Sequence, residues 1–381
     1  MQSVPSMSTH QTQDWCDKAQ QLAETFALTA MENDQQDKFV AENYAALKRD
    51  GFMSAMIPAS LGGGQASYTE MCTVLRTLAK GCSSTALALS MHSHLVATNL
   101  WKLKQGHAVQ GLLQRISAEQ LVLVSTGASD WLHSSGRAEK VAGGFRVNAL
   151  KVFASGCPVG DVLVTSACFD DPEKGPSVIH FPVPFSDPGI VIMDTWQTMG
   201  MRSTASNDIQ LNDVFVPVEK VVMQRPQGLW HPFYNVVCAM AAPLIMSVYL
   251  GIAEAAATLV VDRVKYKKHD PHLPYLLGEM QTSLTACQLA VTDMIRLVNE
   301  FDFLPSDNLA SDILQRKTIA AEAALRCVEK AMETLGGSSF FRSIGLEKLL
   351  RDMHGAQFHP LPEKRQQHFT GSVMLGLVPK G

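Results

Sequence analysis

Three side chains are the candidate general acids and bases of this sequence: His92, His359 and Glu363. Imidazole and carboxylate groups are the side chains that enzymes use most often to move protons. His92 has His94 two residues away, so on a helix only one of the two can face a pocket. His359 precedes a proline, and Glu363 begins a charged run. The simpler interpretation gives the histidines packing roles and leaves Glu363 in water.

Hydroxyl and glycine residues stand at the ends of predicted elements and form a second group of candidates. Ser125 and Thr126 follow the apolar run 122–124, and Ser155 follows Phe153 and Ala154 at the end of another run. Gly336-Gly337 follows a predicted helix. Taken alone, such residues cap strands and helices, because short hydroxyl side chains and glycine satisfy or release the backbone there.

The elements that must position these residues change in type twice along the chain. Apolar residues recur at spacings of three and four from about residue 14 to 116, which predicts helices, and Ser67 with Glu70 predicts a capping box. Six short β-rich runs follow: 122–124, 145–147, 162–164, 177–181, 190–192 and 214–216. Long helices are then predicted at 237–264, 276–301 and 311–335, with a fourth from about residue 345. We predict domains at 1–118, 119–226 and 227–381.

Composition excludes several classes of protein. The chain has 381 residues, of which 46% are hydrophobic and 18% charged, with a formal net charge of −4. This balance offers no basic field for nucleic acid. The eight cysteines show no zinc-binding spacing, and no metal site is expected. The polar N-terminus lacks the apolar core of a signal peptide, and no membrane span is predicted, so we expect a cytoplasmic protein.

Several ordered motifs resemble those of the acyl-CoA dehydrogenase family of flavoproteins. The resemblance covers nearly the whole chain and implies an α+β fold with an N-terminal α-helical domain, a middle β-barrel domain and a C-terminal four-helix bundle. It rests on Pro58 to Gly63, Cys82 to Thr85, Gly143 to Gly156, Trp196 to Pro217, and Gly336-Gly337 with Arg351-Asp352.

The resemblance implies a flavin, FAD with FMN as a further option, and assigns residues to it. Phe153 would pack near the flavin ring, while Ala154 and Ser155 would lie at its N5 and O4 edge. Ser125 and Thr126 would reach the pyrimidine edge, although the following turn, Gly127 to Asp130, is shorter than in the family. Further contacts would reach the dinucleotide of an adjacent subunit, from Lys268, Glu333, Gly336 and Gly337.

The catalytic glutamate of the family is absent from both of its usual positions. Counting from Arg351 places it at Pro360, and the second placement corresponds to about Ala241. Removal of an α-proton from an acyl thioester needs a base. The replacements open to this chain are His92, His359 and Glu363.

The expected function is therefore FAD-dependent α,β-dehydrogenation of an acyl-CoA or a similar small acyl substrate, with electrons passed to an acceptor. Two histidines without a carboxylate also suit a two-component monooxygenase, which shares this fold and receives reduced flavin from a flavin reductase. A third alternative is a flavin-binding member that has lost catalysis. We expect a homo-oligomer, a tetramer or a dimer, built by packing of the C-terminal bundles.

Overall fold

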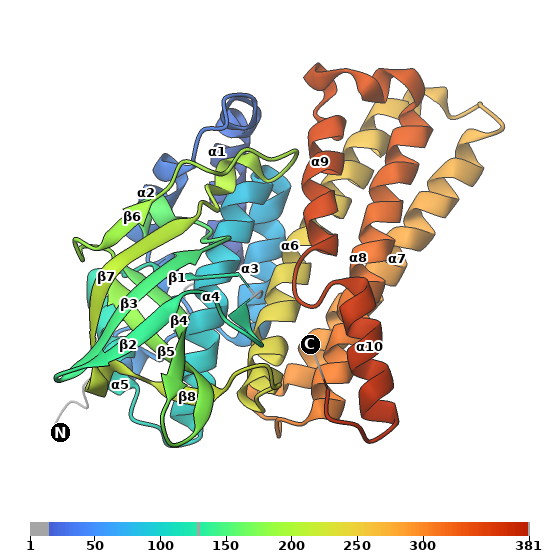
Figure 1. Cartoon of the computed structure of the whole chain (residues 1–381). Helices are drawn as coiled ribbons and strands as arrows, with labels where there is room; N and C mark the ends of the chain where they lie inside the picture. Colours follow the sequence, from blue (N-terminus) through green and yellow to red (C-terminus); the bar gives the residue numbers. More distant parts are fainter. Residues whose placement is uncertain (1–14, 128–129, 380–381) are drawn as a thin grey trace, which may run out of the picture.

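A computed structural model describes residues 15–127 and 130–379 and shows a sheet packed beside the N-terminal helices, which in turn contact the C-terminal helices (Figure 1). The elements change from helices to strands between Glu119 and Leu123, and back to helices between Pro226 and Phe233. The predicted fold class is confirmed. The predictions made for the N-terminal segment 1–14 and for Ala128 and Ser129 in the shortened turn lie outside the described residues.

The N-terminal region contains α1 (Trp15–Gln35), α2 (Ala41–Arg49), α3 (Tyr68–Gly81), α4 (Ser83–Lys104) and α5 (Gln110–Glu119). The capping box at the start of α3 is present: the Ser67 hydroxyl accepts from the Glu70 amide at 3.0 Å, and the Glu70 carboxylate accepts from the Ser67 amide at 2.7 Å. These bonds satisfy two amides that a helix start leaves unpaired. Helix α4 has no charged residue before Lys102, and most of its side chains are buried.

The middle region is one continuous sheet of eight strands in the order β6-β7-β3-β2-β4-β5-β8, with β1 paired in parallel to β4. All six predicted runs lie in strands, but two short polar strands, β2 and β8, had no alternating pattern to reveal them. The strands are β1 (Leu123–Ser125), β2 (Arg137–Val141), β3 (Gly144–Lys151), β4 (Val162–Asp171), β5 (Gly175–Pro184), β6 (Ile190–Ile192), β7 (Ile209–Pro217) and β8 (Met223–Pro226).

The C-terminal region contains α6 (Phe233–Val264), α7 (Leu273–Val298), α8 (Asp307–Leu335), α9 (Leu346–Met353) and α10 (Glu363–Met374). The fourth predicted helix is thus divided into α9 and α10. Gly355, Pro360 and Pro362 lie between the two pieces, and proline disfavours helix at its own position and at the residue before it. The break leaves His359 in an irregular segment rather than on a helix face.

Helix α6 is the core element of the C-terminal region and packs against α3 and α4 of the N-terminal region and against α7 and α8 (Figure 1). By length and composition alone, the segment Phe233–Lys267 is apolar enough to cross a membrane. Inside the protein, however, 94% of its most apolar window is buried. Its apolar surface is therefore used against neighbouring elements of the same chain.

Candidate active site

The residues predicted to hold a flavin gather where β1 ends beside the segment that follows β3. Phe153 is 58% exposed and has a left-handed φ of 59°, which turns its ring out of the sheet. A Cβ atom on Gly127 would lie 2.9 Å from the Phe153 ring, so glycine permits the end of β1 to approach it. Trp196 meets Phe153 edge-on at 6.1 Å between ring centroids. An exposed aromatic wall beside hydroxyl groups fits a flat, polar-edged ring such as a flavin.

Ser125 and Thr126 are half-buried at this edge. The Thr126 hydroxyl donates to the Asp130 carboxylate at 3.2 Å and lies 3.2 Å from the Thr165 hydroxyl. Asp130 in turn pairs with Lys151, whose ammonium nitrogen is 2.9 Å away and whose side chain is fully buried. Thr126 is thus oriented by a buried ion pair, as a binding side chain should be.

The Ser155 hydroxyl belongs to a relay of three hydroxyl groups that ends on a backbone carbonyl. Ser155 Oγ lies 2.7 Å from Ser206 Oγ, and Ser206 Oγ lies 2.7 Å from Thr204 Oγ1. Thr204 donates to the Met201 carbonyl at 2.9 Å. Each hydroxyl has one proton. Since the carbonyl only accepts, Ser206 must donate to Thr204 and Ser155 to Ser206. Ser155 Oγ therefore presents only lone pairs to a ligand.

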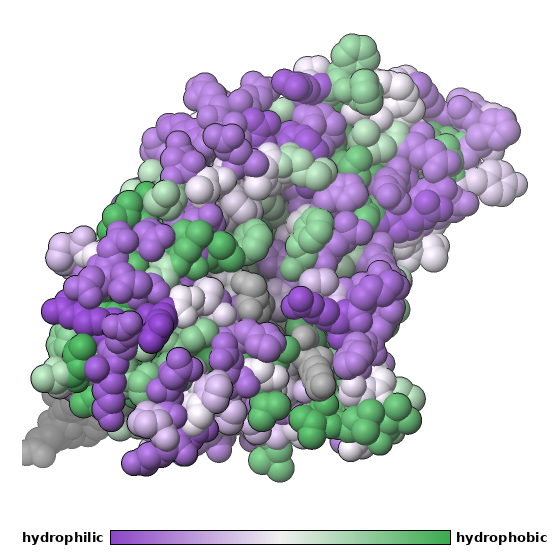
Figure 2. Space-filling view, viewed as in Figure 1, coloured by the Kyte–Doolittle hydropathy of each residue, from purple (hydrophilic) through white to green (hydrophobic). Residues whose placement is uncertain are grey.

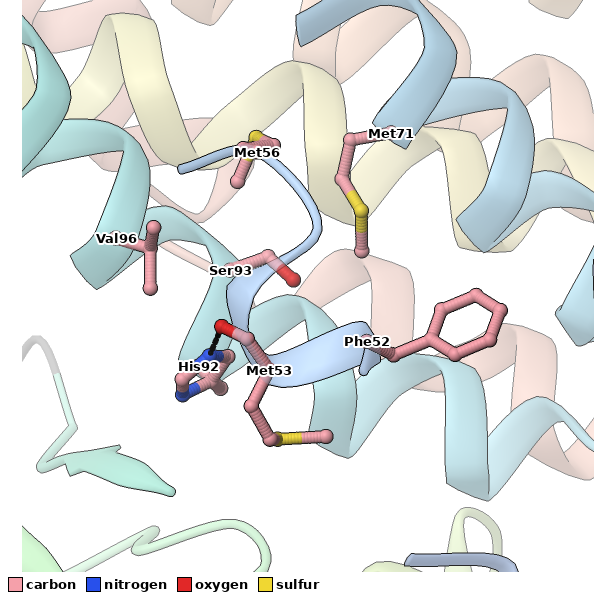
Figure 3. Close-up of a pocket in the computed structure, with 7 residues that line it drawn as sticks. All are labelled: Phe52, Met53, Met56, Met71, His92, Ser93 and Val96. Atoms are coloured by element: carbon pink, nitrogen blue, oxygen red, sulfur yellow. Dashed lines mark hydrogen bonds between the residues drawn. The ribbon is translucent and has the colours of Figure 1, made fainter. Parts of the chain in front are cut away.

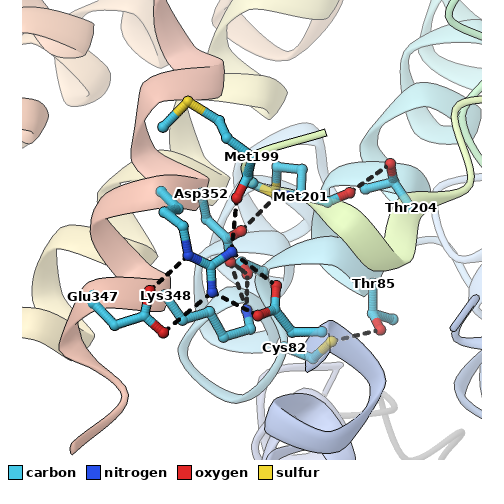
Figure 4. A network of polar contacts seen from close by, with 12 residues as sticks. Cys82, Thr85, Met199, Met201, Thr204, Glu347, Lys348 and Asp352 are labelled. Atoms are coloured by element: carbon cyan, nitrogen blue, oxygen red, sulfur yellow. Dashed lines mark hydrogen bonds and ion pairs between the residues drawn. The ribbon is translucent and has the colours of Figure 1, made fainter. Parts of the chain in front are cut away.

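The Arg351-Asp352 pair joins the three regions of the chain (Figure 4). Asp352 is fully buried and accepts from the Met201 amide at 2.6 Å, the Lys348 ammonium at 2.5 Å and the Ser83 hydroxyl. Arg351 donates to the Asp34 carboxylate at 2.6 Å and to the Met199 carbonyl at 2.7 Å.

The same junction requires a glycine on the sheet side. A Cβ atom on Gly200 would lie 2.2 Å from the Arg351 carbonyl oxygen, so the loop before Met201 packs directly on α9. Arg351 and Asp352 therefore stabilise the packing between the regions of the chain. Both carboxylate oxygens of Asp352 already accept hydrogen bonds, so neither is available as a base.

His359 lies in a different environment, beside Tyr249 of α6. The Tyr249 hydroxyl and His359 Nε2 are 2.8 Å apart, and this is the only hydrogen bond of that hydroxyl in the described part of the chain. A buried phenol needs an acceptor, so Tyr249 donates, Nε2 accepts, and the imidazole carries its proton on Nδ1. Burial, and secondarily the charge of Lys317, lowers the pKa of His359 to about 3. His359 is therefore a neutral hydrogen-bond donor at physiological pH and a weak base.

Lys317 of α8 is the charged group that acts on His359. Its side chain is 2% exposed, and its ammonium group donates to the Leu361 carbonyl at 3.2 Å. No carboxylate pairs with it in the part of the chain that the structure describes, and burial lowers its pKa to about 8. His359 thus has no carboxylate partner in the described structure, and the charge that acts on its pKa is that of the buried Lys317.

His92 joins two segments of the backbone (Figure 3). Its Nδ1 accepts from the Leu123 amide at 3.0 Å, so Nε2 carries the proton and donates to the Met53 carbonyl at 2.8 Å. Burial lowers its pKa to about 4. His94 is likewise buried and its Nδ1 lies 3.4 Å from the Ser90 carbonyl. The structure does not bring His92 together with His359, and both His92 nitrogens are occupied by the backbone.

Glu363 is the first residue of α10, and its side chain contacts neighbouring residues of the same helix. Its carboxylate pairs with the Lys364 ammonium at 2.6 Å and accepts from the Gln367 amide at 2.8 Å. The hydrogen bond from Lys364 lowers the pKa of Glu363. Glu363 is therefore an ionised surface group with no contact to Tyr249 or His359.

The residues assigned to an adjacent subunit's dinucleotide lie at the far end of the bundle. Lys268 follows α6 and is exposed, and Glu333 pairs at 2.8 Å with Lys330, which also pairs with Glu279 of α7. Cβ atoms on Gly336 and Gly337 would meet nothing within 4 Å. Glu333, Gly336 and Gly337 lie at the C-terminal end of α8, and Lys268 lies between α6 and α7, whereas Phe153 follows β3. Within one subunit the structure divides the predicted cofactor residues into two groups.

Sequence reasoning did not single out Tyr249, Lys317, Thr204 or Ser206. Tyr249 and Lys317 lie within long helices, where one aromatic or basic residue gives no signal of its own. Thr204 and Ser206 lie within the Trp196 to Pro217 motif, and the available signal was the spacing of their hydroxyl groups, two residues apart. Figure 2 shows that the surface is hollowed where the sheet domain meets the C-terminal helices.

Comparisons with known proteins agree with this architecture. Residues 9–111 match the family description "Acyl-CoA dehydrogenase, N-terminal domain", and residues 244–363 match "Acyl-CoA dehydrogenase, C-terminal domain". YdbM of Bacillus subtilis, an acyl-CoA dehydrogenase by name, is 28% identical over 92% of this chain and 93% of its own. Isobutylamine N-hydroxylase of Streptomyces viridifaciens is 27% identical over 81% and 83%.

Among solved structures, KijD3 in complex with FMN and a dTDP-linked amino sugar superimposes with a TM-score of 0.87 at 24% identity, covering 98% of this chain and 95% of KijD3. The FMN in that complex agrees with the predicted flavin, FAD or FMN. The flavin enzymes similar to this chain include both dehydrogenases and oxygenases. The chain belongs to the acyl-CoA dehydrogenase family.

Proposed function

We propose that this protein is a reduced-flavin-dependent monooxygenase, supplied with reduced FMN or FAD by a partner reductase and acting on a small organic substrate. The observation that carries the proposal is that no carboxylate pairs with His359 in the described structure. Dehydrogenation of an acyl thioester requires a base, whereas His359 is neutral with a pKa of about 3 and Glu363 is tied to Lys364. The buried carboxylate of Asp352, which adds to the rise that burial causes in the pKa of Tyr249, is already neutralised by Lys348.

When bound, reduced flavin supplies two electrons to O₂, so that one oxygen atom enters the substrate and the other leaves as water. The chain's own residues bind and orient. Phe153 and Trp196 provide the aromatic wall, and Ser125 and Thr126 hold the polar edge. His359 holds a proton on Nδ1, and a neutral donor of this kind can stabilise developing negative charge.

The hydroxyl relay supports preference for reduced flavin. In oxidised flavin, N5 accepts a hydrogen bond, whereas in reduced flavin N5 carries a proton and donates. Ser155 Oγ presents only lone pairs because its proton is donated to Ser206. A Ser155 side chain placed at N5, as the family resemblance implies, therefore matches the reduced form.

The test is to measure the ratio of the dissociation constants for oxidised and reduced FMN under anaerobic conditions. In Ser206→Ala the Ser155 proton is free to donate to oxidised flavin, so this ratio should fall about tenfold, the worth of one hydrogen bond. Ser203→Ala is the matched control, because the Ser203 hydroxyl is buried without a partner in the described structure and lies outside the relay. An unchanged ratio in Ser206→Ala would remove this support.

Dehydrogenation of an acyl-CoA by FAD, with electrons passed to a separate acceptor, is the second candidate. The observation in its favour is the 28% identity to YdbM over nearly the whole chain. His359 would then be the base, with His92 and Glu363 as the other candidates. If the purified protein holds FAD that an acyl-CoA bleaches without oxygen, this reaction replaces the monooxygenase; 18O incorporated from O₂ into a product would exclude it.

We also propose a cytoplasmic homo-oligomer, a tetramer or a dimer, that assembles through the bundle. At the end that carries Gly336 and Gly337, Phe340 is 86% exposed and Phe341 is 65% exposed. Large apolar side chains in such numbers at one end of a domain are typical of contact surfaces. Light scattering after gel filtration gives the mass in solution, and a monomer would contradict the proposal.

A further inference from the structure

We propose an oxyanion-binding subsite between the C-terminal end of α4, the sheet and the N-terminus of α6, built by Lys102, His180, Arg225 and His231. It would bind a carboxylate, sulfonate or phosphate group of a small ligand of the enzyme. The proposal deepens the proposed function, on which it rests, by naming a chemical feature of the molecule that enters the site.

Arg225 is the centre of the subsite. Its side chain is 1% exposed and donates only to neutral acceptors: the Asp130, Leu132 and Pro226 carbonyls at 2.9, 2.7 and 3.3 Å, and His180 Nε2 at 3.0 Å. Its guanidinium carbon lies 5.3 Å from the Tyr234 ring. A buried cation without a paired carboxylate is costly, and a bound anion would offset that cost.

Three half-buried side chains offer unused donors around Arg225. His180 accepts at Nε2, so its proton is on Nδ1, and His231 accepts from the Phe233 amide at Nδ1, so its proton is on Nε2. Neither N–H has a partner in the described chain. The Lys102 ammonium lies 4.6 Å from the Phe233 ring, likewise without an acceptor among these residues.

The electrostatics show that these groups share one neighbourhood. After burial, the largest influences lowering the pKa of His180 are Arg225, Lys151, His231 and Lys102, and together they lower it to about 3. Tyr234, which is 4% exposed, lies beside the Arg225 guanidinium, whose charge acts against the rise that burial causes in the pKa of Tyr234. The N-terminus of α6, a helix of 32 residues, adds positive potential at the same place.

The acids in this neighbourhood do not neutralise it. The Asp130 carboxylate is taken by the Lys151 ammonium at 2.9 Å and by Thr126 and Ser135. The Asp307 carboxylate accepts from the Asn235 side-chain amide at 2.8 Å, and this amide is its only link to the subsite in the described structure. Lys102 therefore has no carboxylate partner in the described structure, and Arg225 has nearby only the Asp130 carboxylate, which pairs with Lys151.

The position of the subsite connects it to the candidate active site. Arg225 binds the carbonyl of Asp130, whose carboxylate accepts from Thr126 at the predicted flavin edge. Trp131 stacks on Tyr234 at 5.1 Å, with Trp230 5.9 Å from Trp131. A ligand with its anionic end here would have aromatic surface beside it. The anionic group comes from the substrate or from the phosphate of the flavin, which share this chemistry.

Binding is tested on the flavin-free protein by titrating sulfate and benzenesulfonate at constant ionic strength while recording the emission of the tryptophans, of which Trp131 and Trp230 lie at the subsite. Saturable binding is expected, and Lys102→Gln should weaken it about tenfold, the worth of one charge-assisted hydrogen bond. Lys104→Gln is the matched control, because Lys104 is on the same helix and pairs at 3.3 Å with Asp302. Absence of saturable binding, or an equal loss in both variants, overturns the proposal.

Two further arms distinguish the source of the anion. If the flavin phosphate occupies the subsite, Lys102→Gln lowers the affinity for FMN but not for riboflavin. If the substrate does, both flavins bind as before and only sulfonate binding is lost. Arg225→Lys keeps the charge but loses the fork of donors, and it should weaken sulfonate binding while Lys104→Gln does not. None of these measurements needs turnover, so they can fail or succeed independently of the monooxygenase assignment.

Discussion

Asp352 and His359 are seven residues apart in the sequence, yet they lie in opposite electrostatic environments. Around Asp352, a buried acid is surrounded by donors from all three regions of the chain, including Lys348 at 2.5 Å. Around His359, a buried cation, Lys317, has only a carbonyl for a partner. The difference shows that the family signature divides into a structural half, where charges are matched, and a chemical half, where the acid has been lost.

Asp352→Asn should have the largest effect, because it removes the buried acid of the charge-matched junction. Loss of the carboxylate leaves Lys348, which is 5% exposed, as an unpaired buried cation. We expect the free energy of unfolding to fall by about 3–5 kcal/mol, as when one partner of a buried pair is removed. Urea denaturation followed by circular dichroism measures the change.

Asp37→Asn provides the comparison for that variant. Asp37 pairs with Arg202 at 2.5 Å, but its side chain is 43% exposed, so the loss should be less than about 1 kcal/mol. Equal effects of Asp37→Asn and Asp352→Asn would show that the buried junction is no more important than a surface pair.

Replacing Lys317, the unpaired cation near His359, should change the free energy of unfolding in the opposite direction. Lys317→Met removes a buried cation and keeps the apolar stem, so we expect a gain at pH 7 of about 3 kcal/mol at most, at 1.36 kcal/mol per pKa unit. A large loss of stability in this variant would contradict an unpaired Lys317.

The pH dependence of the stability contributed by Lys317 follows from the direction of its pKa shift. Its pKa falls from 10.5 in the unfolded chain to about 8 in the folded protein. Between these values the unfolded chain binds more protons, so the stability contributed by this residue rises with pH from about 8 to 10.5. Denaturation midpoints measured across this range should rise in the wild type and lose this component in Lys317→Met.

The smallest expected effect concerns Tyr249→Phe. It removes the 2.8 Å hydrogen bond to His359 and leaves Nε2 without its donor, for a loss of about 1 kcal/mol. Nitrogen NMR shifts of the His359 ring then report whether the proton stays on Nδ1. Tyr266→Phe, at a side chain that is 74% exposed, should change the stability by less than about 0.5 kcal/mol.

Most of the fold could be predicted from the sequence because its signals are local or periodic. The six β-rich runs, the capping box at Ser67 and the long helices each depend on neighbouring residues, and the structure contains all of them. Strands β2 and β8 were missed because their pairing is set by β3, β4 and β5 rather than by their own polar sequences. The division of the fourth helix was also missed, although Pro360 and Pro362 signalled it.

The candidate site was predicted less completely, because proton positions and charge balance depend on contacts between distant segments. The sequence indicates Ser155, but only the path through Ser206 and Thr204 to the Met201 carbonyl shows that its hydroxyl is an acceptor. The sequence offers His92 as a base, but the Leu123 amide and Met53 carbonyl occupy both of its nitrogens.

Gly200 connects the packing of α9 to the relay of hydroxyl groups formed by Ser155, Ser206 and Thr204. A methyl group there would have to displace the Arg351 backbone, since its carbon would lie 2.2 Å from that carbonyl oxygen. The next residue, Met201, supplies the carbonyl on which the three hydroxyl protons are ordered. The packing of this loop on α9 therefore also holds the residue whose carbonyl sets the direction of the hydroxyl hydrogen bonds, so that one close backbone contact serves both the junction and the orientation of Ser155.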